Sequence, residues 1–215
     1  MSEAMRDGIR SRRSIRQFIP EPVAPELLRE LVDTARWAPS HCNTQAIRFI
    51  VVDDPALRRR LVAHGGARVI ERAPQGILVL AADDSDNRAY RPHFQSAAAA
   101  VQNLCLYAHA RGLATCWIIH LPRPRVIRRL FGIPRGWVPT AYVAVGRPSV
   151  EPRPVERKFG LDEVLAFNRY PWGTDGGRKP YLRIMARKLY YLLPVGLKRR
   201  LEEWVNRRFV RQFDN

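Results

Sequence analysis

Residues 39–45, PSHCNTQ, concentrate side chains that donate or accept hydrogen bonds between an apolar helical pattern and an apolar strand pattern. A plain turn needs only Pro39 and Asn43. A nucleophile formed by His41 and Cys42 is disfavoured because adjacent side chains point apart and no orienting acid accompanies them. A metal site is disfavoured because the other histidines are scattered without helical spacing.

The remaining polar side chains of this loop can bind a ligand. Ser40, Asn43 and Gln45 each carry donors and acceptors but little intrinsic reactivity. The composition therefore favours a loop that holds a ligand. The alternative is a helix-to-strand turn whose polar residues are incidental.

A second group of candidate residues lies in 10–18, RSRRSIRQF. We expect this segment to form a helical turn in which Arg12 and Arg16 share one face, with Ser14 nearby. Guanidinium groups and hydroxyls suit a phosphate, whose oxygens an arginine can bind in pairs. The alternative is a solvated basic N-terminus.

Two further segments contain candidate residues, one within a predicted strand and one after the last predicted strand. Residues 112–121 predict a core strand in which Trp117 and Cys116 are ordinary core residues. After Gly146 a proline-rich stretch leads to the adjacent cations Arg157 and Lys158. These two cations could cap an anion, or the stretch could be a plain surface crossover.

The elements that must position these residues alternate along the chain. Periodicity and capping residues predict helices at 23–39, 54–66, 93–112 and 122–133, and strands at 47–54, 75–83, 114–121 and 136–148. Alternation of this kind indicates an α/β or α+β layered domain. Glycine motifs for dinucleotides or for a phosphate loop are missing, and so is a nucleophile elbow.

Length and composition limit the kinds of protein to which the chain can belong. A chain of 215 residues with 46% apolar content suits one domain with a full core. We expect no membrane span, no secretory signal, and a cytoplasmic location. Three cysteines without C-x-x-C spacing argue against a disulfide framework and against a structural zinc.

The formal net charge is +17, and residues 169–215 hold 12 Lys/Arg against 4 Asp/Glu. Nucleic-acid binding is disfavoured because no strand interleaves aromatic and basic residues. Two basic amphipathic helices are predicted within 181–213. They could contact an anionic membrane surface, wrap a partner subunit or cover a site, so peripheral membrane association stays open beside the cytoplasmic location.

Four of these segments, taken in order, resemble the nitroreductase family of flavin enzymes. RRSIRQF resembles its R-R-S-x-R-x-F, and APSHCNTQ its A-P-S-x-x-N-x-Q. AAAAVQNLCLYAHARGLATCWI resembles the family helix and the strand after it, and AYVAVGRPSVEPRP its closing A-x-x-x-G-x-P. The resemblance covers residues 5 to 168.

The resemblance implies an α+β fold, a three-layer sandwich around a mostly antiparallel sheet. It also implies an intertwined homodimer with two FMN sites at the subunit interface. An FMN-binding domain would span 1–168, and a basic helical extension 169–215.

The resemblance also implies roles for individual residues. Phosphate and ribityl contacts would come from Arg12, Arg13, Ser14 and Arg16. The loop with Pro39, Ser40, Asn43 and Gln45 would reach the flavin from the other subunit. The backbone of Trp117 and Ile118 would lie against the ring, and Arg157 and Lys158 would complete the phosphate site. His41 and Cys42 are candidates for the substrate side.

The implied activity is that of an FMN-dependent oxidoreductase. It would move two electrons between NAD(P)H, or a specialised organic substrate, and a nitroaromatic, quinone or enone. Alternatives are a biosynthetic flavin dehydrogenase or oxidase, and a basic protein that binds nucleic acid or membranes without turnover. The family loop often continues Q-P-W where this chain has Gln45-Ala46-Ile47. The flavin destructase branch lacks an asparagine at the position of Asn43.

Overall fold

The computed structural model describes residues 2–84, 87, 89–152 and 154–172, and beyond them positions 185, 189, 190, 193, 194, 196, 197, 200 and 201. The chain divides into two compact units, Met1–Pro152 and Arg153–Asn215, which are described separately. A domain boundary at residue 168 stays a prediction.

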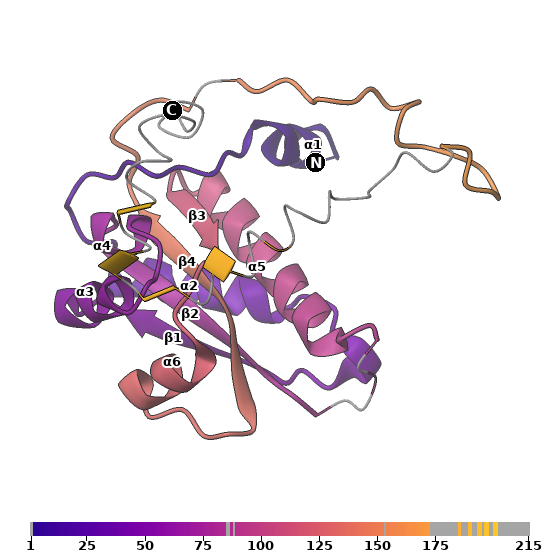
Figure 1. Cartoon of the computed structure of the whole chain (residues 1–215). Coiled ribbons are helices and arrows are strands. Elements are labelled where there is room, and N and C mark those ends of the chain that lie inside the picture. The colour runs from indigo at the N-terminus through magenta and orange to yellow at the C-terminus, as the bar shows by residue number, and fades with distance from the viewer. Residues whose placement is uncertain are drawn as a thin grey trace. The chain divides into compact units, whose positions relative to one another are not determined.

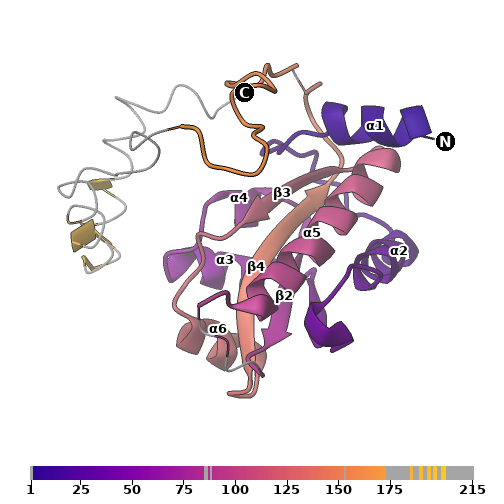
Figure 2. The same ribbon diagram turned by 90° about the vertical axis from the view of Figure 1, so that its right-hand side faces the viewer.

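The first unit is a three-layer α+β sandwich, as expected (Figures 1 and 2). Its sheet has the order β1-β2-β4-β3, and each pairing between these strands is antiparallel. The strands are β1 (Ile47–Val52), β2 (Gln75–Ala82), β3 (Ala114–Ile118) and β4 (Trp137–Gly146).

Helices cover both faces of this sheet and bury a core on each. One face packs against α2 (Pro25–Arg36) and α5 (Pro92–Ala110). The other packs against α3 (Pro55–Ala63), α4 (Val69–Arg72) and α6 (Pro124–Phe131). The alternation of side chains along β2 sends Ile77 and Val79 to the first core and Leu78 to the second.

The predicted helices and strands of this unit are present, and their termini follow the expected local chemistry. The carboxylate of Asp54 accepts a hydrogen bond from the backbone N–H of Ala56 at 2.7 Å and caps α3. Gly112 has φ +69°, a left-handed conformation that ends α5 at little steric cost. Two short helices were not predicted, α1 (Ser2–Ser11) and α4.

The predicted helical turn at 10–18 is wrong. Helix α1 ends at Ser11, and the chain then runs extended beside the sheet. Ser14 pairs with Thr115 of β3, and Phe18 pairs with Pro148 just after β4. Hydrogen bonds to the sheet edge replace those of a helix, and a pattern of local spacing cannot detect such partners.

The second unit contributes an irregular stretch, 154–172, with many exposed apolar side chains. Of the predicted tail helices, positions 185, 189, 190, 196, 197, 200 and 201 are helical, and Met185, Leu189, Leu197 and Leu201 among them are exposed. Most other positions of these predicted helices lie outside the described residues. In the described part of the chain, every helix is too short or too polar to cross a bilayer.

Candidate flavin site

The arginine segment is fastened to the open edge of β3. The backbone N–H of Ile15 donates to the carbonyl oxygen of Thr115 at 2.9 Å, and that of Ile19 donates to Arg147 at 3.1 Å. The backbone of Ser14 therefore lies beside Thr115, two residues before Trp117 on the same strand.

Arg12 and Arg13 are half-buried cations without a carboxylate partner among the described residues. The Nη1 of Arg13 donates to the carbonyl of Arg10 at 2.5 Å and to that of Arg12 at 2.8 Å. The Nε atoms of both arginines are buried and find no acceptor in the described structure. Buried unpaired donors are costly, so this pair is suited to an anionic ligand.

The positive field of this pair reaches α5. Burial, followed by the charges of Arg12 and Arg13, lowers the pKa of His109. The ring of His109 also exchanges a hydrogen bond with the hydroxyl of Ser11 at 2.8 Å. The arginine segment therefore lies against the C-terminal half of α5.

Trp117 has an exposed side chain in an otherwise buried strand. It is 39% exposed, whereas Cys116 and Ile118 on either side are buried. The interpretation of Trp117 as an ordinary core residue is therefore wrong, while that of Cys116 is confirmed. The carbonyl of Thr115 points away from β4, toward the open edge of the sheet. Backbone groups of residues two apart on a strand point to the same side, so the N–H and C=O of Trp117 also face this edge.

The loop that follows α2 has a strained backbone. Cys42, Asn43 and Gln45 have φ of 47°, 53° and 51°, a left-handed region that residues other than glycine seldom adopt. The hydroxyl oxygen of Ser40 accepts from the backbone N–H of Gln45 at 2.9 Å. The side-chain oxygen of Asn43 accepts from the Gln45 amide at 3.1 Å, which leaves the Asn43 NH₂ group free to donate.

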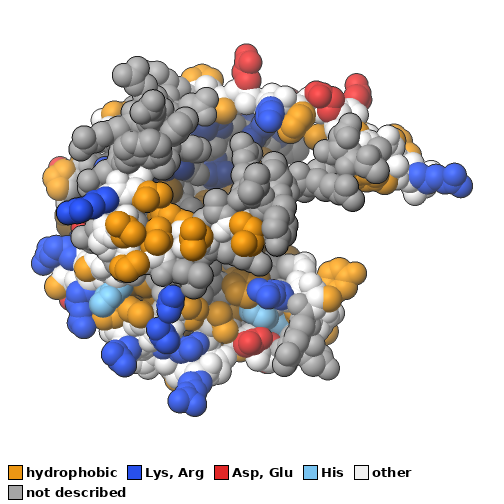
Figure 3. Space-filling view, viewed as in Figure 1, with side chains coloured by type: hydrophobic (Ala, Val, Ile, Leu, Met, Phe, Trp, Pro, Cys, Tyr) orange, Lys and Arg blue, Asp and Glu red, His pale blue; other side chains and the backbone are white. Residues whose placement is uncertain are grey.

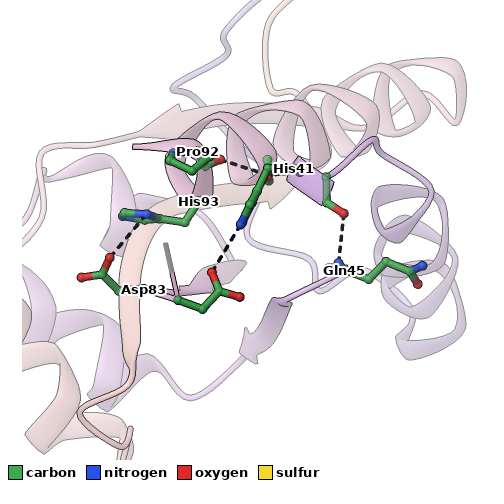
Figure 4. A network of polar contacts seen from close by, with 8 residues as sticks. His41, Gln45, Asp83, Pro92 and His93 are labelled. Carbon is green, nitrogen blue, oxygen red and sulfur yellow. Dashed lines mark hydrogen bonds and ion pairs between the residues drawn. The ribbon is translucent and has the colours of Figure 1, made fainter. Parts of the chain in front are cut away.

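Polar contacts join this loop to the N-terminus of α5 (Figure 4). The buried hydroxyl of Ser96 accepts from the backbone N–H of His41 at 3.1 Å and donates to the carbonyl of Pro92 at 3.0 Å. The ring nitrogens of His41 face Ser96 at 3.3 Å and Asp84 at 3.4 Å. Both nitrogens therefore face partners other than Cys42, and no hydrogen bond joins His41 to Cys42 in the described structure.

The two groups of candidate residues lie at opposite ends of α5. The loop contacts Ser96 and the arginine segment contacts His109. Thirteen residues of helix separate these positions, a distance of about 20 Å. Arg157 and Lys158 belong to the second unit, where both are exposed.

Comparison with known proteins identifies the chain. The model of the nitroreductase family matches residues 9–69 and 63–147, and the two matches together span more than half of the chain. The chain belongs to the nitroreductase family.

Members of this nitroreductase family resemble the chain over most of its length. A putative NADH dehydrogenase/NAD(P)H nitroreductase of Methanothermobacter thermautotrophicus is 31% identical over 68% of this chain and 78% of its own. A 5,6-dimethylbenzimidazole synthase of Rhodospirillum rubrum is 28% identical over 73% and 90%. The solved structure of an FMN-dependent nitroreductase of Clostridium difficile is 25% identical over 76% and 98%, with a TM-score of 0.65.

Sequence reasoning did not find two residues that contact the candidate segments, Ser96 and His109. A serine and a histidine within an alanine-rich helix carry no local signal of function. Only the packing of α5 against two distant segments shows what they contact. Among the described residues, His, Cys, Asp and Glu side chains do not gather into a set that could hold a metal ion.

We expect the substitution Ser96→Ala to lower the free energy of unfolding by about 1–3 kcal/mol, because it leaves the N–H of His41 without an acceptor. Urea denaturation measures the effect. Ser149→Ala is the matched control, since Ser149 is an exposed loop residue. Equal stability of the two variants would show that Ser96 does not hold the loop.

Proposed function

We propose that this protein is an FMN-dependent oxidoreductase that transfers two electrons from NAD(P)H to an acceptor such as a nitroaromatic, a quinone or an enone. The proposal depends above all on one observation. Ser14, next to the arginines with unpaired Nε donors, pairs with the same strand edge that carries the exposed Trp117, so cationic donors and an exposed aromatic residue adjoin each other.

The residues present fit FMN. Buried, unpaired Nε donors on Arg12 and Arg13 suit a phosphate, and we assign Ser14 and Arg16 to the same phosphate and ribityl contacts. The free backbone groups of Trp117 can hydrogen-bond the rim of a ring system, with Ile118 beside it. Bound FMN supplies the electron-transfer chemistry, which is why the site needs no side-chain general base.

We propose that each site is completed by a second copy of the chain. Residues 39–45 lie about 20 Å along α5 from the arginines, too far to serve the same cofactor within one chain. A homodimer would bring Pro39, Ser40, Asn43 and Gln45 of one subunit to the arginines of its partner. A role for Arg157 and Lys158 in phosphate binding stays a prediction.

His41 and Cys42 are proposed to line the substrate side rather than to react. Cys42 is an exposed free thiol, and the contacts of His41 hold the loop to α5. Closure of the site by this loop would exclude water. In this two-chain site, side chains of both subunits would select the small-molecule acceptor and discriminate NADH from NADPH.

Mixing the purified protein with FMN tests the function. We expect a visible flavin spectrum that stays with the protein on gel filtration and bleaches when NADH or NADPH is added without oxygen. A protein that stays colourless after FMN addition would refute the proposal. Elution at the mass of a single chain in the FMN-bound state would refute the two-chain site.

A biosynthetic flavin dehydrogenase or oxidase is the second candidate. The similarity to the 5,6-dimethylbenzimidazole synthase favours it. The loop with Asn43 does not fit the flavin destructase branch of the family, so that particular activity is not proposed. Bound FMN that neither nicotinamide reduces would favour this candidate over the first.

A further inference from the structure

One face of the sheet carries most of the positive charge of the first unit. We call residues 53–72 and 120–136, which contain α3, α4 and α6, the basic layer. The layer holds ten arginines and three acidic residues, a net charge of +7. The remainder of 1–152 holds twelve arginines and ten acidic residues, a net charge of only +2.

Much of this charge faces outward. Arg59 and Arg60 on α3 and Arg125 and Arg129 on α6 are exposed, and none forms an ion pair with a described carboxylate. Figure 3 shows Lys and Arg side chains gathered over the side of the molecule where Figure 1 places α3 and α6. Asp54 cannot offset them fully, since its carboxylate caps α3.

The buried arginine of the layer differs from its neighbours. Arg58 is 7% exposed, and its Nη1 donates to the carbonyls of Val52 at 3.4 Å and Asp53 at 2.6 Å. It therefore ties α3 to the end of β1. With Arg58 packed against the end of β1, the next two arginines, Arg59 and Arg60, face solvent. The packing of α3 therefore exposes these two charges.

The surface chemistry favours lipid over single-stranded nucleic acid. In the described part of the basic layer no Phe, Tyr or Trp is exposed, so the layer lacks the stacking platforms of single-strand binders. The second unit by itself offers exposed apolar residues four apart, Met185 with Leu189 and Leu197 with Leu201, in a stretch rich in Lys and Arg. Apolar and basic side chains on one helix suit a bilayer interface.

We propose that the basic layer docks onto an anionic phospholipid surface, with its exposed guanidinium groups bound to lipid phosphates. None of the residues assigned to the flavin site belongs to the layer, so this interaction is separate from the proposed catalysis. Each arginine at such a surface strengthens binding by about fivefold. Several arginines together therefore give substantial binding, which salt weakens by screening.

Co-sedimentation of the full chain with vesicles tests the proposal. We expect binding to vesicles of phosphatidylcholine mixed with phosphatidylserine, weak binding to phosphatidylcholine alone, and release by added salt. The double variant R125Q/R129Q should bind about 25-fold more weakly. The matched variant R10Q/R29Q loses the same charge outside the layer and should change by less than about threefold.

Three results would overturn the proposal. The first is no binding to the anionic vesicles at low salt. The second is equal binding by R125Q/R129Q and R10Q/R29Q, which would assign any attraction to net charge or to the tail. The third is tighter binding to duplex DNA than to the vesicles at the same salt concentration. Thermal unfolding of both variants confirms that they are folded.

Discussion

Replacing Arg12 with glutamine should weaken FMN binding by about a hundredfold. Glutamine keeps a polar side chain but removes the charge, and a hydrogen bond to a charged group contributes about 1.5–3 kcal/mol. Arg12 has no side-chain partner among the described residues, so its guanidinium is available to a phosphate. Titration of the apoprotein with FMN, followed by flavin fluorescence, measures the dissociation constant.

Arg10→Gln is the matched control, because Arg10 is an exposed arginine in the last turn of α1. Its loss should change FMN affinity by less than about threefold. A second readout does not require the cofactor. Burial and then Arg12 and Arg13 lower the pKa of His109, so Arg12→Gln should raise this pKa in the apoprotein. A raised pKa with unchanged FMN affinity would show that Arg12 does not bind the phosphate.

Gly76→Ala should be the most destabilising of these substitutions, with a loss of about 3 kcal/mol and a melting temperature lowered by about 6–12 °C. A Cβ atom at Gly76 would overlap two ring carbons and the hydroxyl oxygen of Tyr142. Tyr142 is completely buried on the neighbouring strand β4, so its ring has no space into which to move. Calorimetry and urea denaturation measure the loss.

Two controls separate this clash from the general cost of replacing a glycine. Gly136→Ala should be nearly neutral, because an added Cβ there meets no atom within 4 Å. The second control introduces Gly76→Ala into the variant Tyr142→Leu, which lacks the ring. There Gly76→Ala should destabilise the protein less than it does when Tyr142 is present. A full additive loss in the double variant would contradict the steric explanation.

The layered fold could be predicted because its signals are local. The continuous apolar run of β2, the proline and aspartate that begin α3, and the glycine that ends α5 each act within a few residues. Helix α1 was missed since its apolar residues Met5 and Ile9 are exposed and form no clear buried stripe.

The site could be predicted only in part. The order of motifs led from the sequence to the family, and through it to Arg12, Asn43 and Trp117 as candidate residues. Their mutual positions did not follow, because the hydrogen bond between Ile15 and Thr115 joins segments a hundred residues apart. The loop contact with Ser96 is hidden in the sequence for the same reason.

By itself, the sequence determined the four strands and the longer helices α2, α3, α5 and α6, the family and the excess of positive charge, all of which depend on residue types and on short spacings. Only the tertiary structure decided that 12–19 is extended, that Trp117 is exposed at a sheet edge, and that the positive charge of the first unit collects on α3, α4 and α6. Each of these follows from contacts between residues far apart in the chain, where packing and edge pairing outweigh local preference.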